Sequence, residues 1–434
     1  DFFEIQRIES RRIVFLAAIL FALYFLIFFA ACSVVLFFQS GMVRSDGAQA
    51  AFWAAVFSFG MLVFQLWFAE HHGVQILLEM LGASEPDPDD AYHQRLVRLV
   101  EEIGLAAGNF RPTVMILATP ASNALALQQG ERMILAVSEG LVSRLNRNQT
   151  QAVVAHEVAH MLCGDCRLAT WLYSMFTPIL SFVEWLEKVL EDEKKNQGPS
   201  LAGLAELFFS LIALLISRSR ESRADAKAVE LTRNPSALIE ALVIISRQNH
   251  CIGGMGEAFS PICLMPSREH AGLLSSHPPI AKRIQPLLAM QGEPFSRITE
   301  RIDASDIDGE IVPVIKAIVP MKNGVCPECQ KPLTHSVLEG MPIAVCPNRH
   351  GILVQEKRVV RLFARREHKL SSEQREQARL WFRQNQFRLN PREALDKSSR
   401  IHCPQCGLGM FRSFFSYQYN MPVDRCLECK TIWF

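Results

Sequence analysis

Long uncharged runs dominate the first part of the chain and predict membrane helices. Ile13 to Phe38 is a run of 26 residues without a charge, longer than the ~20 residues that a helix needs to cross a bilayer. A second run, Ala51 to Ala69, follows after a short polar interval, so the pair predicts a transmembrane hairpin within residues 1–84. Three arginines precede the first run and favour a cytoplasmic N-terminus, so two crossings return the chain to the cytoplasm.

Two weaker apolar runs, Leu168 to Leu190 and Leu201 to Ser217, predict a second membrane hairpin at about residues 168–217. Each run contains a carboxylate, Glu184 in the first and Glu206 in the second. A charge inside a membrane span costs a few kcal/mol. The alternative is therefore a helical hairpin that lies on the protein.

The segment between the two hairpins has the patterning of a soluble domain. A Pro- and Asp-rich linker at Glu85 to Asp90 precedes apolar positions at helical spacing from Leu96 to Ile103. Three short extended runs then predict a small antiparallel sheet packed on helices, and their ranges are Thr113 to Ala118, Asn123 to Gln128 and Arg132 to Val137. A short helix at Leu141 to Leu145 leads to a longer one that Asn148 or Thr150 can cap.

That longer helix carries His156-Glu157-Val-Ala-His160, the H-E-x-x-H arrangement of zinc proteases. At 3.6 residues per turn the two histidines lie one turn apart on the same face, so both rings can reach one metal while Glu157 sits beside it. The alternative is a buried helix with two hydrogen-bonded histidines.

A zinc ion that performs hydrolysis needs a third protein ligand and an open position for water. The best candidate downstream is Glu221, which opens a helical pattern. Asp225 lies one turn later on the same face, where it can accept the second ring N–H of a ligand histidine. The alternative for these two carboxylates is a solvated helix face.

Four elements in this order resemble the HtpX-type membrane zinc metalloproteases, relatives of the CAAX prenyl proteases within the gluzincins. The resemblance covers about residues 1–290. The elements are Ser122-Asn123-Ala124, the His156 to His160 motif, Glu221-Ser-Arg-Ala-Asp225, and Ser276-His277-Pro278-Pro279 with Arg283.

The resemblance implies that His156, His160 and Glu221 are zinc ligands and that Glu157 is the general base. It also implies that Asn123 and Ala124 pair with an extended substrate by strand addition. His277 and Arg283 would lie near the zinc and help to hold the oxyanion. The alternative for these last two residues is a turn before a helix and a surface charge.

Two cysteine clusters in the last part of the chain predict structural zinc sites, because two Cys-x-x-Cys knuckles about 15–20 residues apart form a tetrahedral zinc site. The second cluster resembles the zinc ribbon of transcription factor IIB and consists of Cys403, Cys406, Cys426 and Cys429. The first is a diverged copy and consists of Cys326, Cys329, Cys346 and, in place of a fourth cysteine, His350. His335 is the second choice for that ligand, and an unoccupied relic is the alternative for the whole cluster.

Between the clusters, residues 356–400 contain 13 Lys or Arg against 6 Asp or Glu, a net charge of +7. Ser371 to Phe387 predicts a helix there. Such a basic segment can touch anionic lipid headgroups or a protein partner, or it can be a solvated connector. The whole chain has a net charge of +1, which does not favour nucleic acid as a partner.

These patterns predict a mainly α membrane protein with an α+β gluzincin metalloprotease domain and two small β zinc-ribbon modules. The predicted domains are residues 1–84, 85–300, 301–355 (first ribbon), 356–400 (basic connector) and 401–434 (second ribbon). The predicted cofactor is zinc, with one catalytic and two structural ions.

The predicted function is that of an integral membrane zinc endopeptidase. The resemblance implies polypeptide substrates, in particular membrane proteins under quality control, and a bacterial inner membrane with the active site and the ribbons in the cytoplasm. Two alternatives stay open at this point. One is a zinc-ribbon adaptor with a protease-like anchor, and the other is a prenyl-protein processing protease.

Overall fold

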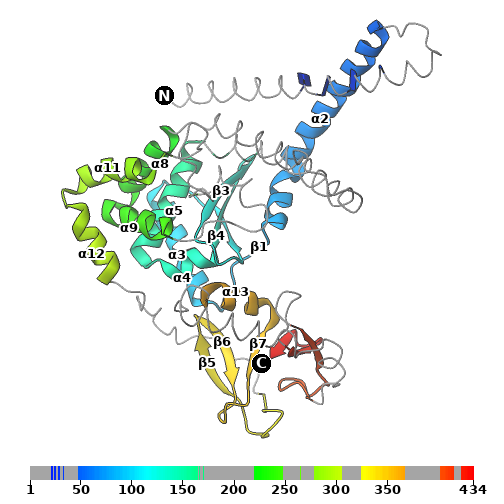
Figure 1. Cartoon of the computed structure of the whole chain (residues 1–434), viewed down its shortest axis with the longest axis vertical. Coiled ribbons are helices and arrows are strands. Elements are labelled where there is room, and N and C mark those ends of the chain that lie inside the picture. Colours follow the sequence, from blue (N-terminus) through cyan, green and yellow to red (C-terminus); the bar gives the residue numbers. More distant parts are fainter. Residues whose placement is uncertain are drawn as a thin grey trace, which may run out of the picture.

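The computed structural model describes residues 47–164, 219–247, 278–304, 324–366, 401–414 and 422–434, with a few isolated positions elsewhere. A long helix projects from a body of helices on a four-stranded sheet, and a second, six-stranded sheet lies below that body (Figure 1). The predicted spans at 13–38, 168–190 and 201–217 lie outside the described residues, apart from isolated positions.

The long helix is α2, Gly47–Met80. Its stretch Ala51–Phe68 is the one helical segment in the described part of the chain that is long and apolar enough to cross a membrane. Large aromatic side chains along it are exposed, among them Phe52, Trp53 and Trp67. The helix thus contains the second predicted span and continues beyond it towards the soluble body.

The four-stranded sheet consists of β1 (Ala83–Ser84), β2 (Thr113–Leu117), β3 (Ala124–Gln129) and β4 (Arg132–Ser138) in the order β1-β2-β4-β3. The strands match the predicted ranges, but the prediction of an antiparallel sheet is wrong, because β2 and β4 are parallel. β3 and β4 form a hairpin, and the loop after β2 places β4 between β2 and β3. β2 and β4, which run in the same direction, are therefore neighbours.

Seven helices complete the described part of this domain. They are α3 (Ala91–Ala106), α4 (Glu139–Arg144), α5 (Arg147–Leu162), α8 (Ser219–Thr232), α9 (Pro235–Ser246), α11 (Ile280–Gln291) and α12 (Phe295–Ala304). The predicted caps of α5, Asn148 and Thr150, are wrong. Asn146 caps the helix, and its side chain and that of Gln149 each accept the other's backbone N–H at 3.0 Å. The two hydrogen bonds together satisfy the backbone N–H groups of Asn146 and Gln149. Asn148 and Thr150 lie inside the helix and cannot form this pair.

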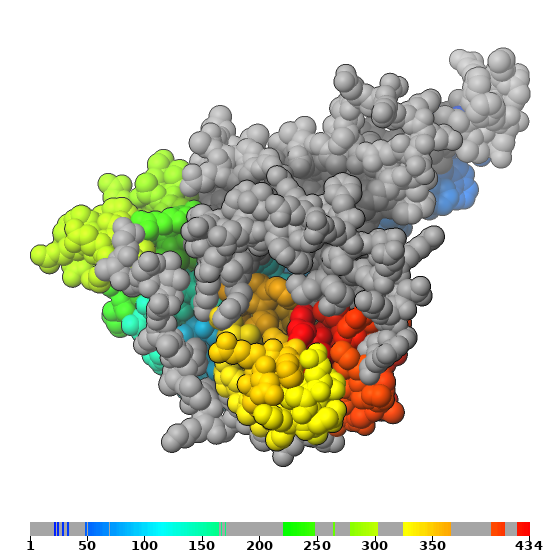
Figure 2. All heavy atoms as spheres, turned by 60° about the horizontal axis from the view of Figure 1, so that its bottom comes forward, coloured from blue at the N-terminus to red at the C-terminus, as the bar shows by residue number. Residues whose placement is uncertain are grey.

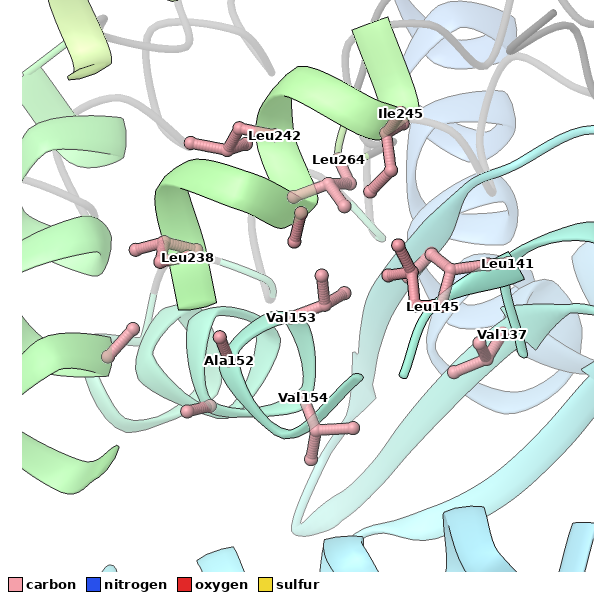
Figure 3. Close-up of a cluster of buried hydrophobic side chains, with 14 of the residues drawn as sticks. Val137, Leu141, Leu145, Ala152, Val153, Val154, Leu238, Leu242, Ile245 and Leu264 are labelled. Carbon is pink, nitrogen blue, oxygen red and sulfur yellow. The ribbon is translucent and has the colours of Figure 1, made fainter. Parts of the chain in front are cut away.

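Helix α5 lies at the centre of the hydrophobic core. Ala152, Val153 and Val154 are almost fully buried against residues of α9 and of the β4–α4 region. Figure 3 shows Leu238, Leu242 and Ile245 of α9 above them, with Val137, Leu141 and Leu145 to one side. Because α5 is packed on several sides, its polar side chains have fixed positions.

The cysteine-rich regions were predicted as two separate ribbons, but their strands form one sheet in the order β5-β6-β7-β10-β9-β8. The join is between β7 and β10, where Thr431, Ile432 and Trp433 pair with Gln355, Val354 and Leu353. In Figure 2 the yellow and the orange-red parts of this module lie side by side. The strands are β5 (Thr334–Leu338), β6 (Met341–Val345), β7 (Ile352–Gln355), β8 (Phe411–Phe414), β9 (Pro422–Cys426) and β10 (Thr431–Trp433).

Helix α13, Glu356–Arg366, follows β7 and lies between the six-stranded sheet and the body above it (Figure 1). The basic segment was predicted to be a solvated connector or a lipid contact, and for this helix both are wrong. Arg358, Arg361 and Arg365 of this helix are buried, and they pair with Asp87 and Asp90, which also shows that residues 85–90 are more than a linker. A buried charge needs a partner, and the acidic loop provides it. The predicted helix at 371–387 lies outside the described residues.

Gly140, in the first turn of α4, packs directly under the loop that leads to β3. A Cβ at this position would lie 2.1 Å from the carbonyl oxygen of Pro120 and 2.5 Å from that of Ala121. We therefore expect Gly140→Ala to destabilise the domain by about 1–3 kcal/mol through overpacking. Thermal unfolding of the purified protein in detergent measures this. Gly409→Ala is the control, because no atom lies within 4 Å of its added Cβ; equal unfolding midpoints for the two variants would contradict the prediction.

Candidate functional site

Helix α5 presents two histidines towards one point. His156 and His160 lie one turn apart, and their Nε2 atoms are 3.2 Å from each other. His156 is fully buried and His160 nearly so. Two such nitrogens face each other at this distance without strong repulsion if they share a cation. The sequence prediction that both rings reach one position thus agrees with the geometry.

Helix α8 packs against α5 and brings Glu221 to the same point. Its Oε1 lies 3.4 Å from His160 Nε2, and its Oε2 lies 3.6 Å from His156 Nε2. Nitrogen and oxygen ligands at ~2.0–2.1 Å from a tetrahedral zinc are about 3.3 Å apart, so the spacing of the three residues fits such an ion. Their candidate ligand atoms all lie within 4.8 Å of one another.

Asp225 lies one turn further along α8 and contacts the other nitrogen of His156, with Oδ1 3.0 Å from Nδ1. A proton on Nδ1 then leaves the Nε2 lone pair directed at Glu221 and His160. Burial opposes the charge of Asp225, but Arg283 and His156 outweigh it and lower the pKa of this carboxyl to about 2. Burial likewise opposes protonation of His156, but hydrogen bonds to Asp225 and Glu221 raise its pKa.

Arg283, from helix α11, holds both carboxylates of α8. Its Nε and one terminal nitrogen lie 3.0 and 2.7 Å from the two oxygens of Asp225, and its other terminal nitrogen lies 3.1 Å from Glu221 Oε2. The side chain is buried, and although burial disfavours its charge, Asp225 and Glu221 raise its pKa. A surface charge is therefore excluded. Its predicted contact with an oxyanion stays a prediction, and the pairing with Asp225 was missed because 58 residues separate the two in sequence.

Glu157 lies beside the two histidines and is 3% exposed. Burial raises its pKa, while the nearby histidines partly oppose that effect. A carboxylate with a raised pKa is better suited to accept and return a proton near neutral pH than an exposed one. His277, the other residue expected near this site, lies outside the described residues.

Ala124 is the first residue of β3 and Asn123 directly precedes it, and β3 is an edge strand, as substrate pairing requires. Asn123 is buried and bound to Ser138: its N–H donates to Ser138 Oγ, and its C=O accepts from both the Ser138 N–H and hydroxyl. The C=O of Ala124 accepts the N–H of Leu264 at 2.8 Å. The C=O of Ala124, which faces away from β4 at the start of this edge, is therefore already hydrogen-bonded within the chain. Substrate pairing by Asn123 and Ala124 stays a prediction.

The two cysteine clusters also have the geometry of metal sites. Cys329 Sγ and Cys346 Sγ are 3.5 Å apart in the first, and Cys406 Sγ and Cys426 Sγ are 3.6 Å apart in the second. Two thiolates on one tetrahedral zinc at ~2.3 Å are separated by about 3.8 Å. In each cluster four candidate ligand atoms lie within 4.8 Å of one another, with His350 as the fourth member of the first.

A shift of one residue in a turn explains why His350 is the fourth member. After Cys326, Cys403 and Cys426 the left-handed residue is the fifth of the knuckle, namely Gln330, Gly407 and Lys430. After Cys346 it is the fourth, Arg349, whose N–H bonds to the Cys346 C=O at 2.9 Å. The turn is one residue shorter, and His350 Nδ1 comes within 3.7 Å of Cys326 Sγ. The second choice, His335, lies on β5 and is not part of the cluster.

The comparisons with known proteins agree with this arrangement. The pattern of Peptidase family M48 matches residues 86–291, a segment that contains the His156, His160 and Glu221 group and ends before the cysteine clusters. A Protease HtpX homolog of Dictyoglomus turgidum is 28% identical over 306 residues, which are 67% of this chain and 95% of the relative. Another, of Streptococcus pneumoniae serotype 4, is 30% identical over 242 residues, 50% of this chain and 79% of the relative.

Among solved structures, the crystal structure of S. mikatae Ste24p matches with a TM-score of 0.31 and 16% identity, over 66% of each chain. The sequence relatives carry the assignment, because the Streptococcus pneumoniae relative is 30% identical and this chain spans 79% of its length. Taken with the family match over the histidine helix, they establish that the chain belongs to peptidase family M48, a family of metalloproteases.

Proposed function

We propose that this chain is an integral membrane zinc endopeptidase whose catalytic ion is held by His156, His160 and Glu221. The observation that carries the proposal is the convergence of these three side chains, with ligand-atom separations of 3.2–3.6 Å, on one point next to the buried carboxylate of Glu157. Three protein ligands leave one position of a tetrahedral ion open, as catalysis requires.

Zinc held there would supply a Lewis acid that polarises a peptide carbonyl and lowers the pKa of a water molecule. Glu157 is placed to take a proton from the attacking water and to pass it to the leaving amine. Asp225 keeps the proton on Nδ1 of His156, and Arg283 holds Asp225 and Glu221 in position. Arg283 accordingly acts by positioning.

The proposed location is the cytoplasmic surface of a bacterial inner membrane, and the proposed substrates are polypeptides, in particular membrane proteins in quality control. The exposed aromatic side chains of α2 support a membrane anchor, because indole rings favour the interface and phenyl rings the lipid. The three arginines before the first apolar run support a cytoplasmic N-terminus. Substrate chains would then be cut close to the point where they leave the bilayer.

The two cysteine clusters are proposed as structural zinc sites. Four protein ligands leave no coordination position for water, so such ions stabilise a fold and do not catalyse. Burial opposes ionisation of Cys346, but backbone N–H groups of Asn348 and His350 lower the pKa of its thiol to about 7, which favours the thiolate that binds metal. With the catalytic ion, we expect about three zinc ions per chain.

Glu157→Gln tests the catalytic role. The amide cannot accept a proton, so we expect cleavage of an unfolded polypeptide to fall by about 10²- to 10⁴-fold, with the zinc content unchanged. Peptide release by the purified variant in detergent measures this. Glu230→Gln makes the same chemical change on an exposed position of α8 and is expected to cleave normally. Wild-type cleavage by Glu157→Gln would refute Glu157 as the general base, whereas absence of cleavage by the parent chain would favour the adaptor alternative.

Glu221→Ala tests the third ligand. Removal of one of three ligands is expected to lower the zinc content by about one ion per chain, while the two cysteine clusters keep theirs. Elemental analysis of the purified protein measures the content. The Cys403→Ser variant provides the comparison, because it affects a cluster site and leaves Glu221 in place. Undiminished zinc at the histidine site in Glu221→Ala would remove Glu221 from the ligand set.

Asp225→Asn tests the orienting role of the carboxylate behind His156. Loss of the charge that fixes the Nδ1 proton is expected to weaken zinc retention by about 10- to 100-fold. Competition with a chelator measures the affinity, and Glu230→Gln is again the matched control on the same helix. The unfolding midpoint of Asp225→Asn must be measured in parallel, because the variant also leaves the Arg283 charge without its main partner. An unchanged affinity in a folded variant would exclude the orienting role.

A further inference from the structure

Helix α13 carries three arginines on one face, and all three are buried against acidic residues of the peptidase domain. Arg358 lies 3.0 Å from Asp87 Oδ2 and 2.7 Å from Asp89 Oδ2. Arg361 lies 3.2 Å from Asp87 Oδ2. These partners are about 270 residues away in sequence. The helix thus bridges the cysteine module and the peptidase domain through ion pairs.

Arg365 makes the densest contacts. It is fully buried, and it donates to Glu139 Oε2 at 2.7 Å, to both oxygens of Asp90 at 3.1 and 2.7 Å, and to the C=O of Glu339 at 2.6 Å. Its guanidinium also stacks on the ring of Tyr92 at 4.7 Å. Burial raises the pKa of Glu139, but the charge of Arg365 and the contact with His93 outweigh it and lower that pKa.

A second contact comes from the turn between β5 and β6. The N–H of Ala91 donates to the C=O of Gly340 at 3.1 Å, at the start of α3. Gly340 has φ +74°, and a Cβ there would lie 2.7 Å from the ring of Tyr92. The module therefore touches the peptidase domain at two points, helix α13 and this turn.

The acidic pocket matches the charge of the α13 arginines. Asp87, Asp90 and Glu139 are at most 3% exposed when α13 is in place. A buried ion pair that loses one partner is strongly destabilising, because the remaining charge is left without compensation. Without α13, these carboxylates would lose their arginine partners, and opening of the pocket to water would solvate their charge.

The pocket adjoins the start of the candidate substrate strand. Glu139 directly follows Ser138, whose side chain holds Asn123 at the start of the edge strand and caps α4. Helix α4 in turn leads to Asn146, the cap of the helix that carries His156. A change at Glu139 thus reaches both the edge strand and the histidine helix through contiguous chain.

The cysteine clusters determine whether α13 is held in place. The core around the clusters contains Cys326, Cys346, Cys403 and Cys426 beside four large apolar side chains, those of Leu333, Leu353, Met410 and Trp433. Because a core this small buries little apolar surface, bound metal supplies much of its folding free energy. The sheet in turn anchors the first turn of α13, because the Glu356 N–H bonds to the Lys430 C=O at 2.9 Å, and Val359 packs on Val354 and Ile432.

We infer that the cysteine module is a metal-dependent clamp on the peptidase domain: metal at the cysteine clusters folds the six-stranded sheet, and the folded sheet holds Arg358, Arg361 and Arg365 in the pocket of Asp87, Asp90 and Glu139. The inference rests on the proposed structural zinc sites and not on the proposed catalysis. Loss of cluster metal opens the pocket and loosens the segment that leads to the histidine helix.

The test is hydrogen exchange of the full chain in detergent, in a Glu157→Gln background so that the result does not depend on proteolysis. The variants are Cys403→Ser with Cys406→Ser, and Arg365→Ala. In both, amide protection at 87–93 and 139–144 is expected to fall at least about tenfold, while 96–103 in the core of α3 stays protected. The matched control is Val360→Ala, which shortens a side chain of the same helix at a position that is 50% exposed and is expected to leave both segments protected.

Deprotection confined to 401–434 in the cysteine variant would overturn the inference, as would unchanged protection of the pocket in Arg365→Ala. If Arg365→Ala also deprotects 96–103, Arg365→Lys replaces it. Lysine keeps the charge but lacks the forked donors that reach Glu139, Asp90 and Glu339 together. Protection of the pocket equal to that of the parent chain in Arg365→Lys would likewise refute the clamp.

Discussion

Neutralisation of buried charge is the constraint on which this structure depends. Asp225 and Glu221 are buried next to the histidine helix and are paired with Arg283, and Asp90 and Glu139 are buried below the sheet and are paired with Arg365. An unpaired charge at such depth costs several kcal/mol, so each carboxylate selects one arrangement of the helices around it. Helices α5, α8 and α11 meet where these pairs can form.

The burial of charged and polar side chains also fixes the geometry of the candidate site. A helix buried on several sides leaves its polar side chains little freedom, and α5 directs His156 and His160 towards Glu221 of α8. Asp225 contacts the other ring nitrogen of His156, and Arg283 contacts both Asp225 and Glu221. The hydrophobic core supplies the rigidity, and the ion pairs supply the orientation.

The cysteine module is an integral part of the peptidase. The family match ends at residue 291, yet the module docks on residues inside the matched segment, near the start of α3 and at the end of β4. Its two clusters lie on one sheet. Its helix α13 enters an acidic pocket that includes Glu139, and the preceding residue, Ser138, hydrogen-bonds to Asn123 just before the candidate substrate strand.

Local patterns in the sequence determined the histidine helix, the strand positions and the spacing of the cysteine knuckles, because each depends on residues close together in the chain. The spacing of Arg358, Arg361 and Arg365 on one helix face was also visible, but not that this face is buried. Only the tertiary structure decided the parallel pairing of β2 with β4, the joining of two ribbons into one sheet, and the partners of Arg283 and Arg365. These features arise from contacts between segments up to 275 residues apart, and their energy depends on burial that exists only once the chain has folded.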